Sequence, residues 1–524
     1  MDGSTRRIQN SLKNILFGLY GQIISIGMGF VVRTVFIFTL GIEYLGVDGL
    51  FTSILLMFSL ANLGFDTAII YSLYRPLAEK DIYKIQALMN LYQKAYRLIG
   101  VVVLLIGLSL LPFLDHLVNA DTTIKDINII YLLFLISSVS SYYFVYKQSI
   151  IIADQSNYII SKIHTLFMII SNALQIVLLI IISDYIVVLV AQLTLKVIEN
   201  VYIANKANKL YPFLKEKNNA KLSKTDRREF FENLYSLLLY KISGVVINAT
   251  DNIVISKFIG VIWVGVYSNY LLILNTLNTL LGYLFYSITA SVGNLNVKEN
   301  AEKKYFIFRV INFLNFWIYG FCTVCLWNLI NPFITIWLGE EYVFNKYVLF
   351  FILLNFFTSG MQNTTTMFRE TTGLFKKGKY RPIIAAIINI VVSIILAKQI
   401  GIAGVLLGTV ISRLCTYFWY DPYIIFKMIF KKSVKVYFIR YILFVVLVLF
   451  SIIATDFIGY IFHINIFMDM AIRSILCLII PNLIFWMVFK EAEEYRYFLN
   501  LTRILIKKIK PKILTRKFPN DNYP

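Results

Sequence analysis

The chain has 524 residues, of which 58% are hydrophobic and only 15% charged, and its mean hydropathy is +0.71. A soluble protein of this size needs a more polar surface, so the composition excludes a soluble globular fold. The net charge of +21 does not indicate nucleic-acid binding, because the basic residues lie between apolar runs and not on one soluble face.

The apolar runs are long enough to cross a bilayer, which takes about 20 residues in a helix. The first run is uncharged from 14 to 32, is longer than a signal-peptide core, and is expected to remain as a span. The pattern predicts an all-α polytopic membrane protein with about 14 transmembrane helices. The predicted spans are 14–40, 49–74, 97–115, 127–147, 163–183, 185–205, 234–258, 264–290, 306–330, 346–368, 382–399, 402–426, 438–459 and 470–489.

The basic residues predict the orientation in the membrane. Of the 50 Lys and Arg residues, 41 lie in segments on the side of the two termini, and five lie in or near the opposite loops. Cytoplasmic segments of membrane proteins carry this excess, so both termini are expected to be cytoplasmic. The basic tail from Lys490 is expected to lie against the anionic inner leaflet.

The two halves of the chain begin with similar stretches, RTVFIFTLGIEYLGVDGL at 33–50 and NIVISKFIGVIWVGVYSN at 252–269. Gly41 aligns with Gly260 and Gly46 with Gly265, both at an offset of 219 residues. An even number of spans in each half gives both halves the same direction in the membrane. We therefore predict two pseudo-symmetric six-helix lobes around a central cavity, with an appended helix pair. The predicted parts are an N-lobe (1–213), a cytoplasmic linker (214–233), a C-lobe (234–430), two further spans (431–489) and a basic tail (490–524).

Polar groups inside predicted spans are candidate binding residues, because an intramembrane charge costs about 2.5–3.5 kcal/mol on insertion scales. Arg33 and Gln22 are eleven residues apart, nearly three helical turns, and share one face of the first span. Lys241, Asn248 and Asn252 share a face of the seventh span in the same way. Arg33 could instead pair with Asp66 or extend to the outer surface, and Lys241 could extend to the cytoplasm.

Four further polar residues complete the candidate set. Arg413 lies in the twelfth span, and Asn269 in the eighth is either cavity lining or a helix-to-helix contact. Asp66 is either the partner of Arg33 or part of an ion-coupling path. Asp251 is either a coupling carboxylate or the partner of Lys241 or Lys257.

The sequence lacks the motifs of several enzyme classes. GxxxxGK[ST], HExxH and GxSxG are absent, and the opposite-side loops are too short for an external catalytic domain. Cys322 and Cys325 form a CxxC inside a span without nearby His, which favours small buried residues over a metal site. We therefore expect a protein that is not an enzyme and holds no metal or cofactor.

The stretch from Leu40 to Asp81, LGIEYLGVDGLFTSILLMFSLANLGFDTAIIYSLYRPLAEKD, resembles the polysaccharide flippases of the multidrug/oligosaccharidyl-lipid/polysaccharide (MOP) exporter superfamily. TDNIVISKFIGVIWVGVYSNYLLI at 250–273 and WLGEEY at 337–342 are similar to later segments of that group. The resemblance is greatest to Wzx-like capsular repeat-unit transporters of Gram-positive bacteria and covers essentially the whole chain.

This resemblance implies a flippase of a bacterial cell membrane that moves undecaprenyl-pyrophosphate-linked oligosaccharide repeat units to the outer leaflet, for capsule or other surface polysaccharide. It also implies alternating access and a cationic central cavity. The absence of GxxxxGK[ST] predicts transport without ATP hydrolysis, and either return of the empty carrier or antiport of H⁺ or Na⁺ would close the cycle. A polysaccharide polymerase and glycosyltransferases are the expected protein partners. The resemblance also implies that Arg33, and then Arg413, contact the substrate phosphates.

Three other functions remain open from the sequence. A multidrug or metabolite antiporter of the same superfamily would favour acidic cavity residues, whereas the intramembrane excess here is basic. A lipid II flippase shares the physics of transport but not the resemblance at residues 41–81. A membrane-bound polysaccharide polymerase would need larger external loops.

Overall fold

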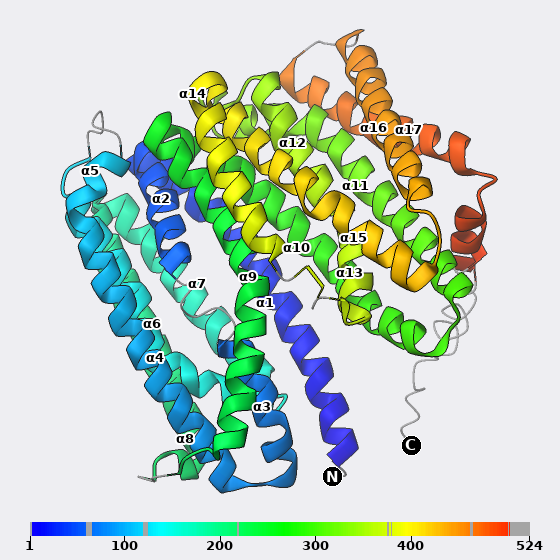
Figure 1. The fold of residues 1–524 in the computed structure, drawn as a ribbon. Helices are drawn as coiled ribbons and strands as arrows, with labels where there is room; N and C mark the ends of the chain where they lie inside the picture. The colour runs from blue at the N-terminus through cyan, green and yellow to red at the C-terminus, as the bar shows by residue number, and fades with distance from the viewer. Residues whose placement is uncertain are drawn as a thin grey trace, which may run out of the picture. The chain divides into compact units, whose positions relative to one another are not determined.

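The computed structural model describes residues 3–58, 65–118, 124–216, 220–374, 377–378, 380–461, 465–500 and 502–503. Helices and short connections make up this part of the chain, and no strand occurs in it, which confirms the predicted all-α class (Figure 1). The α-helices are α1 (Gly3–Leu40), α2 (Ile42–Phe58), α3 (Phe65–Glu79), α4 (Ile82–Leu110), α5 (Leu114–Leu117), α6 (Ile127–Ala153), α7 (Asn157–Ile181), α8 (Tyr185–Leu210), α9 (Lys224–Phe258), α10 (Val261–Lys298), α11 (Ala301–Trp337), α12 (Lys346–Met361), α13 (Asn363–Thr371), α14 (Arg381–Cys415), α15 (Tyr417–Ile425), α16 (Lys435–Ile461) and α17 (Ile466–Phe489).

Ten helical segments of the described chain are long and apolar enough to cross a membrane, so the protein is a multi-pass membrane protein. One of them, residues 381–430, covers two predicted spans. The remaining predicted spans fall on α2 and α3, on α9, and on α12 and α13. The count of 14 remains a prediction.

Some predicted boundaries differ from the helices. The span predicted at 49–74 contains most of α2, up to Phe58, and α3 from Phe65, and the residues between them lie outside the described part of the chain. The span predicted at 346–368 breaks at Gln362, where the hydroxyl of Thr365 donates to the Gln362 carbonyl oxygen at 2.9 Å. Threonine side chains that bond to nearby backbone compete with the helix, which explains a break in this polar stretch. Within the predicted linker, α9 already begins at Lys224, because the Ser223 hydroxyl caps it by accepting from the backbone N–H of Asp226.

By packing, the chain forms two compact units. The first comprises Met1–Thr276 and Lys379–Ser412, and the second comprises Leu277–Gly378 and Arg413–Pro524. These units follow from packing, whereas the predicted lobes follow from the sequence repeat, so the lobe boundaries remain a prediction.

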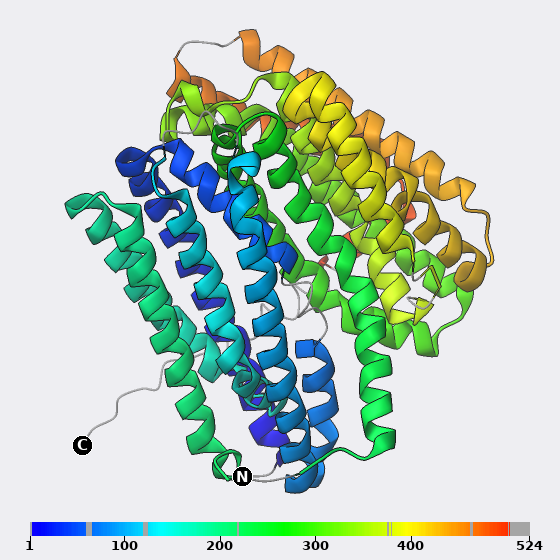
Figure 2. The same ribbon diagram turned by 60° about the vertical axis from the view of Figure 1, so that its left-hand side comes forward.

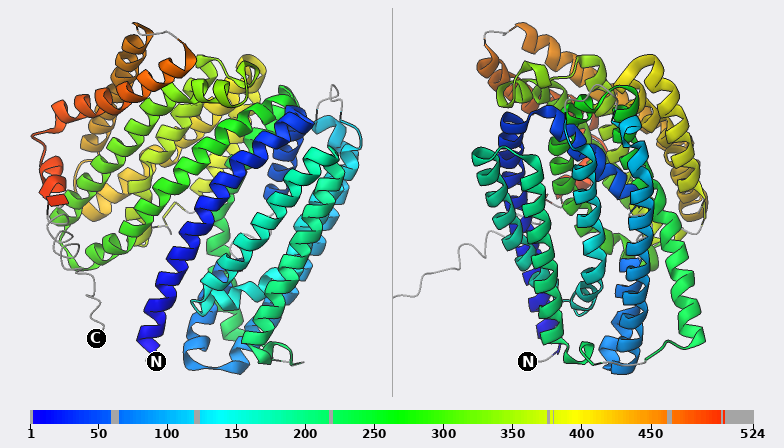
Figure 3. Two further views of the ribbon diagram at one scale, coloured as in Figure 1. Left: turned by 180° about the vertical axis from the view of Figure 1, so that it is seen from behind. Right: turned by 90° about the vertical axis from the view of Figure 1, so that its left-hand side faces the viewer.

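In the first unit, α4, α6 and α8 pack side by side, and α1 packs along α7 (Figures 1 and 3). Helix α2 packs against α9, which joins elements from the beginnings of the two sequence halves. Tyr92, Tyr96 and Tyr131 are fully buried in this unit. The hydroxyl of Tyr131 donates to the carbonyl oxygen of Gly107 at 3.0 Å, as expected for a buried phenol.

Helix α14 contains a sharp turn, because Ile400 and Gly401 have non-helical backbone angles and Gly401 has φ +62°. Its two legs pack closely against each other, and Figure 2 shows them in yellow. A Cβ at Gly408 would overlap with Ser393, so only glycine permits this approach. The turn separates the spans predicted at 382–399 and 402–426.

The second unit is built around α11, which contacts α12, α13, α16 and α17. Its core is aromatic: the rings of Phe316 and Phe444 stack with centroids 4.0 Å apart, and Phe485 lies 4.8 Å from Phe316. Each such pair stabilises the fold by about 0.5–1.5 kcal/mol beyond the contribution from burying its apolar surface.

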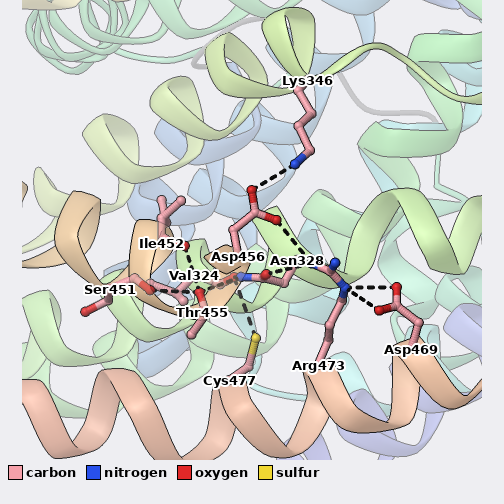
Figure 4. A network of polar contacts seen from close by, with 10 residues as sticks. All are labelled: Val324, Asn328, Lys346, Ser451, Ile452, Thr455, Asp456, Asp469, Arg473 and Cys477. Atoms are coloured by element: carbon pink, nitrogen blue, oxygen red, sulfur yellow. Dashed lines mark hydrogen bonds and ion pairs between the residues drawn. The ribbon is translucent and has the colours of Figure 1, made fainter. Parts of the chain in front are cut away.

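A polar network joins the appended pair α16 and α17 to α11 (Figure 4). Arg473 contacts both carboxylate oxygens of Asp469, at 3.0 and 2.9 Å, and donates to Asp456 at 3.1 Å. It also donates to the side-chain oxygen of Asn328 on α11 at 3.3 Å, and Lys346 pairs with Asp456 at 2.8 Å. These charged and polar partners offset the desolvation cost of partly burying the Arg473 guanidinium.

Residues 493–500 are helical and contact the same unit through Glu494. Its carboxylate pairs with Arg309 of α11 at 2.6 Å and with Arg440 of α16 at 2.5 Å. Burial acts to raise the pKa of Glu494, but hydrogen bonds from Arg440 and Arg309 outweigh it and lower the pKa to about 2. The first part of the basic tail is therefore tied to α11 and α16 by charge.

Candidate functional site

The glycines that define the predicted repeat have matching roles in the first unit. Gly41 separates α1 from α2 with φ +89°, and Gly260 separates α9 from α10 with φ +132°. Residues with a Cβ rarely adopt such angles, so glycine is required at both turns. The offset of 219 residues therefore relates two positions with the same local backbone function.

The second glycine pair brings the repeats into contact. A Cβ at Gly46 would overlap with the carbonyl oxygen of Val261, and a Cβ at Gly265 would overlap with the carbonyl oxygen of Ile42. The N-terminal turns of α2 and α10 thus approach backbone to backbone, which only small residues permit. The contact lies one helical turn from residues that carry the candidate polar groups.

Arg33 lies late in α1, and its Nη1 donates to the hydroxyl oxygen of Ser268 on α10 at 2.7 Å. Among the residues that the structure describes, Arg33 forms no direct ion pair, and its remaining guanidinium nitrogens have no hydrogen-bond partner. Gln22 lies on the same continuous helix, so Gln22 and Arg33 lie nearly three turns apart on one face of α1. An intramembrane guanidinium held by one neutral hydroxyl keeps most of its donors available for an anion.

Asp48 is a neighbour of Arg33 that the sequence reasoning missed. It attracts Arg33 electrostatically, and the hydroxyl of Tyr185 donates to its Oδ1 at 2.9 Å. Residues 41–48 fall between the predicted spans 14–40 and 49–74, whereas the structure includes all of them after Gly41 in α2. The signal available in the sequence was Asp48 itself, a carboxylate directly before the predicted span at 49–74. Asp66, the predicted partner, has a side chain outside the described residues.

Asn252 and Asn269 are both buried in the first unit. The amide nitrogen of Asn252 donates to the hydroxyl oxygen of Ser53 on α2 at 2.9 Å, which links α9 to α2. Neither amide atom of Asn269 has a hydrogen-bond partner among the described residues. A buried unpaired polar group costs about 1–3 kcal/mol, so Asn269 stands out beside Ser268 and its contact with Arg33.

Asp251 accepts a hydrogen bond from the hydroxyl of Thr409 at 2.8 Å, and Thr409 in turn accepts from the amide nitrogen of Asn389 at 2.8 Å. All three side chains are buried. Lys257, one of its predicted partners, instead donates to the carbonyl oxygen of His116. The side chain of Lys241, the other predicted partner, and that of Asn248 lie outside the described residues.

Arg413 belongs to the second unit, apart from the residues above, which belong to the first. Its Nη1 donates to the carbonyl oxygen of Asn355 on α12 at 3.1 Å. The structure therefore brings Arg33, Asp48 and Ser268 together, and it attaches Arg413 to a different helix set. No group of three or more His, Cys, Asp or Glu residues in the described chain is arranged to hold a metal ion.

No protein-family model matches the sequence, and no curated protein matches it. Solved structures do match. The lipid II flippase MurJ in an inward closed conformation has a TM-score of 0.63 and 16% identity, over 91% of this chain and 99% of that chain.

An inward-facing multidrug resistance MATE family transporter of the MOP superfamily matches with a TM-score of 0.59 and 15% identity, over 76% of this chain and 93% of that chain. A MATE transporter of Vibrio cholerae matches with a TM-score of 0.51 and 13% identity, over 82% of this chain and 99% of that chain. Identities this low establish a shared fold and no shared substrate. The chain is therefore a multi-pass membrane protein with the fold of the transporters and flippases of the MOP superfamily.

Proposed function

We propose that the protein is a flippase of a bacterial plasma membrane that moves undecaprenyl-pyrophosphate-linked oligosaccharide repeat units from the cytoplasmic to the outer leaflet. The repeat units would then enter capsule or another surface polysaccharide. The protein works by alternating access, without ATP hydrolysis or a catalytic step, and both of its termini face the cytoplasm. The resemblance at residues 40–81 and the shared fold with a lipid flippase support this proposal.

The observation that carries the proposal is the state of Arg33. It is an intramembrane guanidinium with a single hydrogen bond within the described residues, to the neutral hydroxyl of Ser268, and Asp48 attracts it without a direct ion pair. A planar guanidinium stays charged and binds two phosphate oxygens at once, so it suits a pyrophosphate better than a lysine would. Hydrogen bonds to charged groups contribute about 1.5–3 kcal/mol each, which is a tenfold to hundredfold effect on binding. From the resemblance, Arg413 is proposed as a further residue that contacts a substrate phosphate.

The polar groups around Arg33 fit the sugar part of such a substrate. Sugars cannot cross hydrocarbon, because buried hydroxyl groups without partners are costly. Gln22, Asn252 and Asn269 carry amide groups on α1, α9 and α10. Lys241 and Asn248 are proposed to join them, although their side chains lie outside the described residues. The unpaired amide of Asn269 is one place where a substrate or water would satisfy a buried group.

Energy for outward transport is available without ATP. Moving an anion outwards across an inside-negative membrane is favourable by about 2.3 kcal/mol per charge per 100 mV. H⁺ or Na⁺ antiport would complete the cycle, and Asp251 and Asp66 are the coupling candidates. Replacing Thr409 by Val would remove the hydroxyl that donates to Asp251 and would probe this role.

The test is a flipping assay with the purified full-length protein in liposomes that contain lipid-linked oligosaccharide extracted from the source cells. Arg33→Ala is expected to lower the flipping rate about tenfold to a hundredfold, and Arg33→Lys to restore only part of it, because lysine keeps the charge but loses the planar fork. Arg75→Ala is the matched control, since Arg75 forms an exposed ion pair with Glu79 in the same unit.

The same assay separates the alternatives. Flipping of lipid II in preference to the extracted oligosaccharide would favour a peptidoglycan flippase, and transport of organic cations alone would favour a multidrug antiporter. Polymer formation in the liposomes would indicate a polymerase. Wild-type rates in Arg33→Ala at normal protein abundance would refute the role assigned to Arg33.

A further inference from the structure

The second unit contains an open pocket of about 360 Å³, the α10–α13 pocket, which polar and apolar residues of α10, α11, α12 and α13 line. Its volume is at the lower end of the range of ligand sites, about 300–1,000 Å³. None of the residues that could carry the pyrophosphate in the proposed function lines it.

Two helices line the pocket with residues at helical spacing. Asn278, Gly282 and Tyr286 lie four residues apart along α10 and therefore share one face. On the opposite wall, Asn363 and Glu370 are seven residues apart at the beginning and end of α13. The break at Gln362 allows α13 to begin there, so the polar stretch that interrupts the predicted span also forms a wall of the pocket.

Tyr319 of α11 connects the two walls. Its hydroxyl accepts from the amide nitrogen of Asn363 at 3.0 Å and lies 3.5 Å from the amide oxygen of Asn278. The Tyr319 side chain is 3% exposed, so its ring is fixed in the core and only its hydroxyl is directed to these amides. A Cβ at Gly360 would overlap with this ring, so the glycine of α12 sets the position of Tyr319.

The lining has a definite chemistry. Among the described lining residues there is no Lys or Arg, whereas amides, hydroxyls and the carboxylate of Glu370 are present. The described lining residues therefore offer a phosphate no cation. Amides, hydroxyls and carboxylates are the groups that exchange hydrogen bonds with a polyol. Tyr286 is 80% exposed at the rim and offers an aromatic ring to the apolar face of a sugar.

We propose that the α10–α13 pocket binds a sugar residue of the transported head group and contributes to selection among glycans. This inference rests on the proposed function and names a second part of the substrate, separate from the pyrophosphate assigned to Arg33. On the predicted topology the pocket lies toward the cytoplasmic ends of α10 and α13, where a glycan made in the cytoplasm would enter. A site built to hydrogen-bond hydroxyls discriminates strongly against analogues that lack them.

Gly282 allows a test that spares the fold. A Cβ at this position would meet no atom within 4 Å, so a larger side chain would extend into open space in the pocket. Gly282→Leu should therefore block the pocket without overpacking the helices. Gly27→Leu is the matched control, because Gly27 is also helical and exposed, and its Cβ would also meet no atom within 4 Å.

The experiment measures binding to the purified full-length protein in nanodiscs. The probes are undecaprenyl pyrophosphate without sugars and lipid-linked oligosaccharide extracted from the source cells. Gly282→Leu and Asn363→Ala are expected to weaken binding of the oligosaccharide lipid about tenfold or more and to leave binding of undecaprenyl pyrophosphate unchanged. Gly27→Leu should bind both probes like the wild type, and Arg33→Ala should weaken binding of both.

Two results would overturn the sugar pocket while leaving the flippase proposal intact. One is equal binding of both probes by Gly282→Leu and by the wild type, while Arg33→Ala still weakens both. The other is loss of binding of an aromatic cation such as ethidium in Gly282→Leu and Glu370→Gln, with oligosaccharide binding unchanged. Failure of the wild type to bind either lipid would instead refute the proposed function.

Discussion

Replacing Gly46 by Val tests the backbone contact between α2 and α10. A Cβ at Gly46 would overlap with the carbonyl oxygen of Val261 and would lie 2.8 Å from its carbonyl carbon and 3.1 Å from its Cγ2. The obstacle is backbone, so the helices must separate for the new side chain to fit. Overpacking of this kind costs typically about 1–3 kcal/mol. Val has a higher helix propensity than Gly, but this difference is less than 1 kcal/mol. The net effect of Gly46→Val on the free energy of unfolding is therefore destabilising.

The measurement is the Tm of the detergent-solubilised protein, with size-exclusion chromatography to confirm a monodisperse sample. Gly46→Val should lower the Tm by a few degrees. Gly27→Val, in the open position on α1, should leave it within a degree or two. Gly265→Val should lower the Tm about as much as Gly46→Val. The decrease in the Tm of the double variant should be smaller than the sum of the two single decreases, because both changes disrupt one contact. Equal Tm values for Gly46→Val and Gly27→Val would refute the close approach.

The two polar networks of the second unit give further predictions. Arg473→Leu should destabilise the protein by about 3–5 kcal/mol, seen as a lower Tm, because it leaves the carboxylates of Asp469 and Asp456 without their shared cation; an unchanged Tm would contradict this. The folded-state pKa of Glu494, about 2, lies below its ordinary value of 4.5, so its contribution is complete above pH 4.5 and is lost as the pH falls toward 2. Tm measured between pH 5 and 2 should therefore fall less for Glu494→Gln than for the wild type, and parallel curves would argue against the effect.

The parts of the fold that the sequence could predict depend on local chemistry. Long apolar runs predict spanning helices, because the bilayer leaves few other structures that satisfy the backbone. Glycines at matched offsets predict turns, and Gly41 and Gly260 both have positive φ. The turn at Ile400 and Gly401 falls between two predicted spans, because a short break between apolar runs leaves room only for a hairpin.

The break inside the span predicted at 346–368 was harder to predict. The break at Gln362 had a signal in the run of Asn and Thr that follows, but polar side chains in a span are equally compatible with contacts between helices.

The partners of the candidate site residues could not be predicted, because they come from distant helices. Arg33 and Ser268 are separated by 235 residues, and Asp251 and Thr409 by 158. Spacing along one helix predicts which residues share a face, but it does not predict which helix that face contacts. For this reason Gln22 and Arg33 could be grouped from the sequence, whereas Asp48 was missed.

Helix α11 is the element of the second unit best suited to hold a binding group in place. Between helices in lipid there is little hydrophobic driving force, so packing and polar contacts must fix their positions. On α11, Asn328 joins the network of Arg473, and Arg309 pairs with Glu494. Tyr319 lies between these two anchors on the same helix, with its ring confined by Gly360. A side chain held this firmly can discriminate between hydroxyl positions, since selectivity requires that the protein group does not move to follow the ligand. On the proposal of a sugar pocket, the appended pair α16 and α17 and residues 493–500 help to position the α11 wall of the α10–α13 pocket, although neither α16 nor α17 lines it.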